Sequence, residues 1–206
     1  MIDAPFRRLL PRFTRRLIAV YTRVGLTPNH ITIAGFALAV GAAVCVACGQ
    51  YALAVAVWWL SRLADGTDGI YARETGRVTD LGGFLDIVLD MAGYGAMVLG
   101  FAVSRPDLAM LWHAILFLYI LCITGALALG GIERTKGLGA VDNRTLRLAA
   151  GLAEGGETGI AYSLFLLFPA YLGPLACLWI AILALTVITR ILLAYKMLNS
   201  GATDAR

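Results

Sequence analysis

Long apolar stretches alternate with short polar ones along most of this 206-residue chain. A helix needs about 20 consecutive apolar residues to cross the hydrocarbon core of a bilayer, and several stretches approach that length. They predict six transmembrane helices, at residues 30–49, 51–70, 82–103, 108–131, 155–173 and 175–197. We therefore expect an all-α, polytopic membrane protein with a single domain over residues 1–206. Its six-helix bundle would occupy residues 30–197.

The N-terminal segment, residues 3–23, has a different pattern from these apolar stretches. Apolar side chains recur there at helical spacing, with arginines on the opposite face: Phe6, Leu9, Leu10, Phe13, Leu17 and Val20. A basic amphipathic helix lies in the plane of the membrane surface, so we predict an interfacial helix that anchors the chain. A contribution to closing the mouth of an active site is the alternative.

The composition of the chain supports a membrane location. Hydrophobic residues make up 60% of the chain and charged residues only 15%, whereas a soluble domain has roughly 25% charged residues. The net charge of +4 suits anionic lipid headgroups, and no pattern indicates a nucleic-acid partner. Basic residues precede the first span, occupy the loops after the second and fourth spans, and close the chain. The positive-inside rule therefore predicts cytoplasmic N- and C-termini in the plasma (inner) membrane.

Four aspartates stand near the cytoplasmic ends of the second and third predicted spans. Asp65 and Asp68 are three residues apart, and Asp86 and Asp90 are four apart. Each pair shares a helix face, and a short loop between the spans would bring the two faces together. Because ionised carboxylates at membrane depth are costly, we expect the cluster to bind cations. Oxygen ligands favour Mg²⁺ or Mn²⁺, and two such ions would balance four negative charges. For a single aspartate the alternative is an ion pair, and Arg62 is available to Asp65.

These aspartates belong to a longer motif, Asp65-x2-Asp68-Gly69-x2-Ala72-Arg73-x8-Gly82-x3-Asp86-x3-Asp90. All eight fixed positions match, without a gap, the signature of the CDP-alcohol phosphatidyltransferases. A chance match at a given start is on the order of one in a billion. The stretch from Leu26 to Thr32 is similar to the segment that helps to hold the nucleotide in that family. The chain therefore resembles this family in its motif and in its six-span layout, with a site that faces the cytoplasm.

The resemblance implies roles for the residues of the motif. Asp65, Asp68 and Asp86 would bind two divalent metal ions, and Asp90 would act as the general base and as a further metal ligand. The cytidine diphosphate part of a lipid donor would lie in a pocket formed by Pro28, Asn29, His30, Ile31, Gly69, Ala72, Arg73, Thr79 and Gly82. For Thr79 the alternative is the N-cap of the following helix. For His30 we expect at most a backbone contact.

A second set of residues provides candidates for binding the acceptor. Arg190 lies within an apolar run and needs an anionic partner there, and in the family basic residues of the later spans hold the acceptor phosphate. Arg134 and Lys136 are weaker candidates, since a basic loop also follows from topology. Glu157 could pair with Arg190 or bind acceptor hydroxyls, or it could simply favour a helix N-terminus.

The resemblance implies an enzyme that transfers the phosphatidyl group from CDP-diacylglycerol to the hydroxyl group of a small polar alcohol and releases CMP. We favour an anionic acceptor, such as glycerol 3-phosphate or an inositol phosphate, and by analogy a homodimer. Serine or an unphosphorylated alcohol is an alternative, as is a choline- or ethanolamine-type transferase that acts on diacylglycerol. A divalent-cation transporter would also use aspartates within the membrane, and a non-catalytic lipid-binding scaffold is a third possibility.

Overall fold

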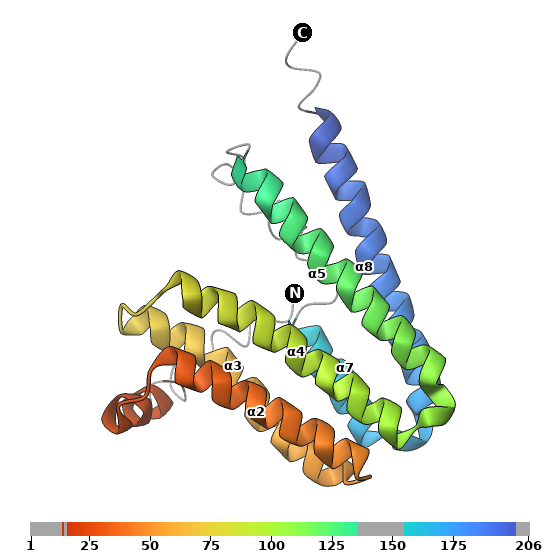
Figure 1. Cartoon of the computed structure of the whole chain (residues 1–206), viewed down its shortest axis with the longest axis horizontal. Coiled ribbons are helices and arrows are strands. Elements are labelled where there is room, and N and C mark those ends of the chain that lie inside the picture. The colour runs from red at the N-terminus through yellow and green to blue at the C-terminus, as the bar shows by residue number, and fades with distance from the viewer. Residues whose placement is uncertain (1–13, 15, 136–154, 201–206) are drawn as a thin grey trace. The chain divides into compact units, whose positions relative to one another are not determined.

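The computed structural model describes residues 14, 16–135 and 155–200, and these residues form helices joined by short turns, without a strand. A helix at residues 16–24 comes first. The labelled helices of Figure 1 are α2 (Pro28–Ala47), α3 (Tyr51–Glu74), α4 (Asp80–Ser104), α5 (Ala109–Thr135), α7 (Gly155–Leu167) and α8 (Leu172–Ser200). Short 3-10 turns at Pro106–Leu108 and Pro169–Tyr171 precede α5 and α8. The all-α prediction is confirmed for this part of the chain.

In the described parts of the chain, four helices are long and apolar enough to cross a bilayer: Pro28–Ala47, Asp80–Ser104, Pro106–Ile132 and Pro169–Lys196. The predicted spans at 51–70 and 155–173 are not among them. Charged side chains interrupt the apolar run of α3, and α7 has only 13 described residues, about 20 Å of helix. Residues 3–13 and 15 of the predicted interfacial helix lie outside the described residues.

The chain forms two compact units. The first comprises residues 1–107 and 162–169, and the second residues 108–161 and 170–206. In the first unit α2 packs against both α3 and α4. Small residues allow this close approach: a Cβ atom on Gly100 of α4 would lie 2.5 Å from the carbonyl oxygen of Ala43 of α2.

Aromatic side chains fill the core of the first unit. Trp58 of α3 lies 5.3 Å from Tyr162 between ring centroids, and Phe101 of α4 lies 5.5 Å from Phe165. The Tyr162 hydroxyl donates a hydrogen bond of 3.0 Å to the carbonyl oxygen of Tyr94. Aromatic pairs in these tilted and edge-on arrangements add to the stabilisation from buried area, so α3 and α4 are held together through large side chains.

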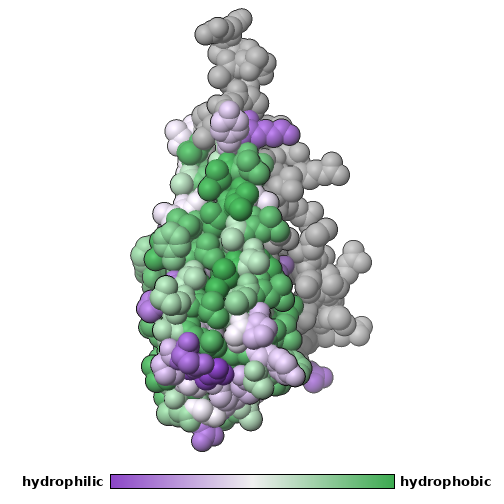
Figure 2. All heavy atoms as spheres, turned by 90° about the vertical axis from the view of Figure 1, so that its right-hand side faces the viewer, coloured by the Kyte–Doolittle hydropathy of each residue, from purple (hydrophilic) through white to green (hydrophobic). Residues whose placement is uncertain are grey.

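In the second unit α5 packs against α8. The indole nitrogen of Trp179 donates a hydrogen bond of 2.9 Å to the hydroxyl of Tyr119. Apolar side chains are also exposed on these helices, such as Phe117, Ile120 and Leu178, and hydrophobic side chains predominate on the face shown in Figure 2. Exposed apolar surface of this extent marks a membrane or protein contact. Together with the four long apolar helices, it indicates an integral membrane protein.

Local signals in the sequence set the turns beside the motif. Thr27 caps α2, and Pro28 occupies the first turn of that helix, where proline is favoured. After α3, Gly76 adopts a φ of 64°, which glycine tolerates best. The amide of Arg77 then donates a hydrogen bond of 2.8 Å to the carbonyl oxygen of Ala72. This glycine turn ends α3 and returns the chain towards α4, whose N-cap is Thr79.

Candidate functional site

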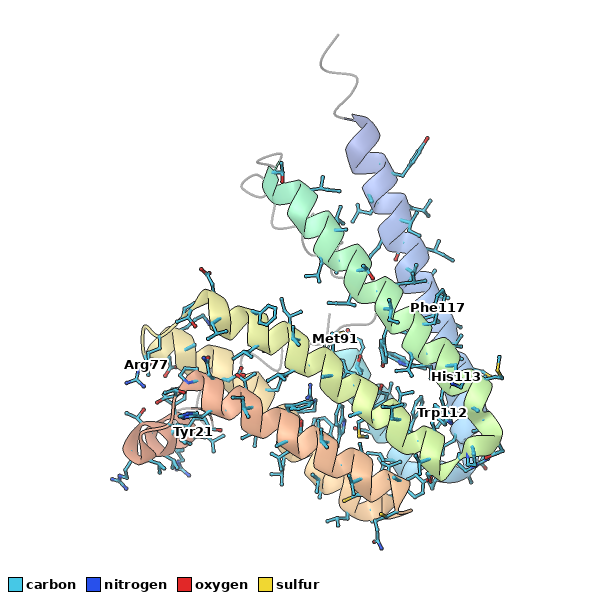
Figure 3. The ribbon with its side chains drawn as sticks, viewed as in Figure 1. Tyr21, Arg77, Met91, Trp112, His113 and Phe117 are labelled. Carbon is cyan, nitrogen blue, oxygen red and sulfur yellow. The ribbon has the colours of Figure 1, made fainter. Side chains whose placement is uncertain are left out.

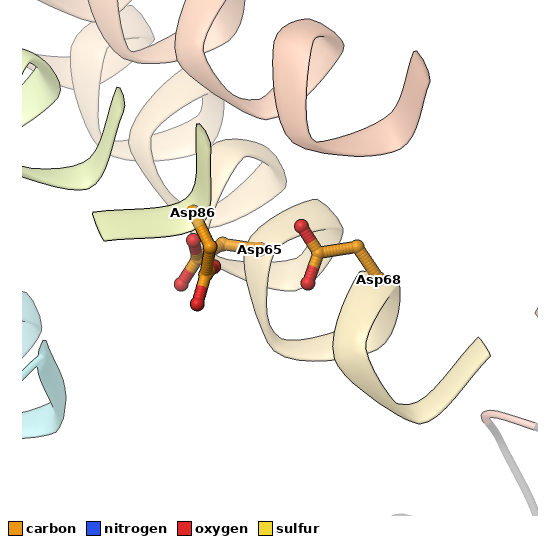
Figure 4. Close-up of side chains that lie close together, drawn as sticks. All are labelled: Asp65, Asp68 and Asp86. Atoms are coloured by element: carbon orange, nitrogen blue, oxygen red, sulfur yellow. The ribbon is translucent and has the colours of Figure 1, made fainter. Parts of the chain in front are cut away.

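Three of the four motif aspartates come together. Asp65 and Asp68 lie on α3 and Asp86 lies on α4, and one carboxylate oxygen from each lies within 4.8 Å of the others. Figure 4 shows Asp65 and Asp86 side by side, with Asp68 next to them on α3. This aspartate trio is the arrangement expected from the spacing of the motif. Three carboxylates at this separation repel one another unless a cation lies between them, and their oxygens suit a hard divalent cation.

Asp68 is the most constrained member of the trio. Only 5% of its surface is exposed. The hydroxyl oxygen of Thr32, from α2, lies 2.5 Å from Asp68 Oδ2, and the amide of Gly69 donates a 2.5 Å hydrogen bond to Asp68 Oδ1. Both carboxylate oxygens are therefore held in a fixed orientation. Partners of this kind orient metal ligands and raise metal affinity.

Asp90 lies outside the aspartate trio. Its Oδ1 accepts a hydrogen bond of 2.8 Å from Arg62 Nη1, and its Oδ2 accepts one of 3.3 Å from the hydroxyl of Tyr94. The same Arg62 nitrogen lies 3.4 Å from Asp65 Oδ2, so the alternative ion pair between Arg62 and Asp65 is present. Its shorter contact, however, is with Asp90. The prediction that Asp90 is also a metal ligand stays a prediction.

A cavity of about 230 Å³ opens beside the trio, and Asp68 and Asp86 form part of its wall. Seven of the nine residues predicted for the nucleotide pocket also line this cavity: Pro28, Asn29, Gly69, Ala72, Arg73, Thr79 and Gly82. Arg77 is a further lining residue that the motif does not contain, and it lies in the turn between α3 and α4 (Figure 3). The cavity wall therefore carries two arginines, which suit an anion, and two aspartates, which suit a cation.

Two glycines keep part of this wall open. A Cβ atom on Gly82 would lie 3.1 Å from Thr79 Oγ1 and 3.2 Å from Asn29 Oδ1. A Cβ atom on Gly69 would lie 3.3 Å from Arg73 Nη1. These approaches are closer than ordinary van der Waals contact, so a side chain at either position would displace a residue that lines the cavity.

His30 and Ile31 do not line this cavity. The ring nitrogen Nδ1 of His30 accepts a hydrogen bond of 3.3 Å from the amide of Thr27, which completes a capping box at the start of α2. Ile31 is buried in a cluster with Ile18 and Tyr71. Both residues therefore hold the helix start that carries Pro28 and Thr32, and a direct contact with a nucleotide stays a prediction.

The acceptor candidates lie elsewhere in the chain. Arg190, on α8, donates a hydrogen bond of 2.5 Å from Nη1 to the carbonyl oxygen of Cys122 on α5. Glu157 lies in the first turn of α7, where a carboxylate is favoured by the helix dipole. The side chain of Arg134 and all of Lys136 lie outside the described residues. Binding of an acceptor by these four residues stays a prediction.

Comparisons with known proteins agree with the motif. The sequence profile described as CDP-alcohol phosphatidyltransferase matches residues 25–198. The inner membrane protein YnjF of Escherichia coli is 33% identical over 97% of this chain and 98% of its own length. The archaetidylinositol phosphate synthase of Pyrococcus horikoshii is 30% identical over 86% of this chain and 88% of its own.

Among solved structures, the fold resembles that of the Mycobacterium tuberculosis phosphatidylinositol phosphate synthase PgsA1, crystallised with CDP-DAG bound. The TM-score is 0.62 at 24% identity, over 89% of this chain and 94% of that chain. This likeness supports the helical architecture described above.

Proposed function

Because the chain belongs to the CDP-alcohol phosphatidyltransferase family, we propose that it transfers the phosphatidyl group of CDP-diacylglycerol to the hydroxyl group of a small anionic alcohol. The acceptor oxygen forms a bond to the phosphorus of the phosphatidyl group, and the bond from that phosphorus to CMP breaks. The observation that carries the proposal is the aspartate trio, because two of its members form the wall of a cavity that two arginines also line.

The cofactor we propose is a pair of divalent cations, Mg²⁺ or Mn²⁺, held by Asp65, Asp68 and Asp86. The oxygens of these residues approach within 4.8 Å of one another, and hard carboxylate ligands match both ions. When bound, such cations would polarise the diphosphate and offset the negative charge on departing CMP. The role of Thr32 and Gly69 is to keep Asp68 oriented towards this site.

The cytidine diphosphate part of the donor would occupy the cavity. Arg73 and Arg77 line it, and a guanidinium group binds phosphate oxygens through paired hydrogen bonds. Gly69 and Gly82 leave room along the helix backbones, while Pro28, Asn29, Ala72 and Thr79 form the remaining wall. In this proposal His30 and Ile31 act indirectly, because they fix the start of α2.

Asp90 is the proposed general base. An acceptor hydroxyl becomes a better nucleophile as its proton passes to a positioned carboxylate, and Asp90 would take that proton while the new bond to phosphorus forms. Both oxygens of Asp90 already have donors, Arg62 and Tyr94. These donors fix the direction of the carboxylate before a substrate arrives.

The acceptor we favour is an inositol phosphate. The relative from Pyrococcus horikoshii is named an archaetidylinositol phosphate synthase, and an anionic acceptor agrees with the basic residues of the later helices. Arg190, Arg134 and Lys136 are the candidates for the acceptor phosphate, with Glu157 as a candidate for its hydroxyl groups. Glycerol 3-phosphate is the second anionic candidate.

The membrane arrangement that we propose adds detail to the four spans described above. We propose that α3 and the segment containing α7 also cross the membrane, giving six spans in one domain with an interfacial helix over residues 3–23. The positive-inside pattern supports cytoplasmic termini and a cytoplasmic active site in the inner membrane. A homodimer is proposed by analogy with the family.

CMP release tests this function. The purified protein would be incubated with CDP-diacylglycerol, Mn²⁺ or Mg²⁺, and single acceptors: an inositol phosphate, glycerol 3-phosphate, inositol, serine or choline. We expect CMP to appear only with metal and an anionic acceptor. CMP release with serine or another unphosphorylated alcohol, but not with an anionic acceptor, would overturn the acceptor assignment.

A parallel experiment tests the competing functions. The same protein in sealed vesicles would be supplied with Mn²⁺ outside and a fluorescent metal indicator inside. Metal entry without CMP release would favour a divalent-cation transporter. Product formation from CDP-choline and diacylglycerol, but not from CDP-diacylglycerol, would favour the choline-type reaction. If the protein binds CDP-diacylglycerol but shows neither metal entry nor turnover, a non-catalytic lipid-binding scaffold is favoured.

A further inference from the structure

Tyr71 occupies a variable position of the family motif, between Gly69 and Ala72 of α3. Gly69 and Ala72 line the cavity beside the aspartate trio, whereas Tyr71 does not. We propose that Tyr71 is a positioning residue for the lipid donor: its hydroxyl holds the start of α2 against α3 and so sets the width of the cavity. The proposal rests on the proposed function, because it takes this cavity to bind the cytidine diphosphate part of the donor.

The hydroxyl of Tyr71 connects α3 with the chain that leads into α2. It donates a hydrogen bond of 2.9 Å to the carbonyl oxygen of Leu26, and only 1% of the Tyr71 surface is exposed. Leu26 precedes Thr27, the N-cap of α2, so its carbonyl oxygen lies outside the hydrogen bonds of that helix. A buried hydroxyl with a defined acceptor therefore links α3 to the residue just before the α2 cap.

The turn that carries Leu26 has a defined geometry of its own. The amide of Gly25 donates a hydrogen bond of 3.2 Å to the carbonyl oxygen of Thr22. The amide of Leu26 donates one of 3.0 Å to the carbonyl oxygen of Tyr21. These two bonds form a Schellman motif, in which Gly25 adopts a φ of 74°. The helix at residues 16–24 therefore ends in a fixed turn, and this turn fixes the position of Leu26.

Packing around the ring of Tyr71 reinforces the link. Tyr71 lies in a buried cluster with Ile18 of the first helix and Ile31 of α2. Its ring meets that of Tyr21, labelled in Figure 3, edge-on at 5.6 Å between centroids. The hydroxyl of Tyr21 lies 3.2 Å from Thr67 Oγ1 on α3. Three helices therefore meet around the Tyr71 side chain, and its hydroxyl has a fixed direction.

The two segments that Tyr71 joins form two walls of the cavity. Pro28 and Asn29 line it from the first turn of α2. Ala72 and Arg73, which directly follow Tyr71, line it from α3. The hydrogen bond of Tyr71 holds these walls together without occupying the space between them. If the bond is lost, the start of α2 can move away from α3, and a nucleotide between the walls loses part of its contacts.

A second link between α2 and α3 serves the metal site instead. The Thr32 hydroxyl of α2 contacts the carboxylate of Asp68, whereas the Tyr71 hydroxyl bonds to a backbone carbonyl oxygen. The two links therefore predict different defects. Loss of the Thr32 hydroxyl should weaken metal binding, and loss of the Tyr71 hydroxyl should weaken donor binding.

The test compares Tyr71→Phe with the wild-type protein, because this change removes the hydroxyl and keeps the ring. We expect the KM for CDP-diacylglycerol to rise about fivefold, as for the loss of one neutral hydrogen bond. The kcat and the Mn²⁺ affinity measured without donor should not change, since a rise in KM alone reports a lost binding contribution. An unchanged KM would overturn the proposal. A lower kcat or weaker Mn²⁺ binding would also overturn it, because either result indicates a general structural defect.

Tyr51→Phe is the matched control. Tyr51 is the first residue of α3, about 30 Å along the helix from Tyr71, and its hydroxyl lies 2.6 Å from Ser104 Oγ of α4. This change also removes a hydrogen bond between helices, but at the other end of α3. Both variants should melt at a slightly lower temperature than the wild-type protein, and only Tyr71→Phe should raise the donor KM. Equal rises in KM would refute the positioning role.

Amide hydrogen exchange measures the start of α2 directly, without a substrate. Residues 26–31 should exchange faster in Tyr71→Phe than in the wild-type protein, and at the wild-type rate in Tyr51→Phe. Equal exchange in all three proteins would show that the Tyr71 hydroxyl does not hold this segment, and the proposal would be wrong.

Failure of this proposal is distinguishable from failure of the proposed function, because calorimetry measures the Kd for CDP-diacylglycerol without an acceptor. Tyr71→Phe should bind the donor about fivefold more weakly than the wild-type protein. If the wild-type protein binds the donor but releases no CMP with any acceptor, the function is wrong, and the two Kd values decide on Tyr71. If the wild-type protein does not bind the donor, both proposals are wrong.

Discussion

Removal of the Thr32 hydroxyl tests how the aspartate trio is held. Thr32→Val keeps the shape of the side chain but deletes the group that lies 2.5 Å from Asp68 Oδ2. Asp68 is 5% exposed, so water cannot easily replace the lost donor. A hydrogen bond to a charged group is worth about 1.5–3 kcal/mol, which corresponds to roughly a 10- to 150-fold loss in metal affinity.

The assay is a Mn²⁺ titration of the purified protein, combined with CMP release over a range of Mn²⁺ concentrations. We expect Thr32→Val to need more Mn²⁺ for half-maximal rate and to regain most of its kcat at saturating Mn²⁺. Thr32→Ser, which keeps the hydroxyl, should resemble the wild-type protein.

Thr67 provides a matched control on α3. It is also buried and precedes Asp68, but its hydroxyl bonds to the carbonyl oxygens of Leu63 and Ala64, both at 2.9 Å, rather than to a carboxylate. Thr67→Val should therefore leave Mn²⁺ affinity unchanged. Equal affinities for the two valine variants would refute the reasoning, as would a Thr32→Val defect that saturating Mn²⁺ does not relieve.

Three further variants and one control variant test the rest of the site. Asp90→Asn should lower kcat by at least about a hundredfold without weakening the binding of CDP-diacylglycerol, measured by calorimetry; normal turnover would show that another group is the base. Gly82→Ala should raise the KM for CDP-diacylglycerol by roughly 5- to 30-fold, because overpacking costs about 1–2 kcal/mol, whereas Gly125→Ala, on α5 with nothing within 4 Å of the added Cβ, should not; equal KM values would contradict the steric argument. Arg190→Ala should raise the KM for an inositol phosphate about tenfold and leave that for the donor unchanged, and an equal rise for both substrates would exclude Arg190 from the acceptor pocket.

The sequence could predict the aspartate trio because its geometry is mostly local. Asp65 and Asp68 share a face of α3 by their spacing alone, and the short connection to α4 places Asp86 beside them. The loop signals were equally local, so that Thr79 could be proposed as an N-cap before the structure showed it. A capping signal was also present at Thr27, three residues before His30, and it could have indicated that the His30 ring serves the helix start.

Other contacts depend on how helices pack, and spacing does not reveal them. The hydroxyl of Thr32 meets Asp68 across 36 positions of sequence, and Arg62 meets Asp90 across 28. Both contacts depend on how one helix is rotated and shifted along its axis relative to its neighbour. From the sequence, Arg62 could be paired only with Asp65, its neighbour on the same helix. The Arg62–Asp65 ion pair is the longer of the two that Arg62 forms with motif aspartates.

Charge links the metal site and the donor cavity. The four ionised motif aspartates and Arg62 together carry three net negative charges, and Arg73 and Arg77 of the cavity reduce this to one. A diphosphate adds further negative charge, so the donor alone would enter a site of its own sign. Two divalent cations make the net charge of the site positive. The cations then strengthen the binding of the donor, and the donor strengthens the binding of the cations. Because such a coupling is reciprocal, the cations and the lipid donor are best understood as a single ligand that the trio and the two cavity arginines bind together.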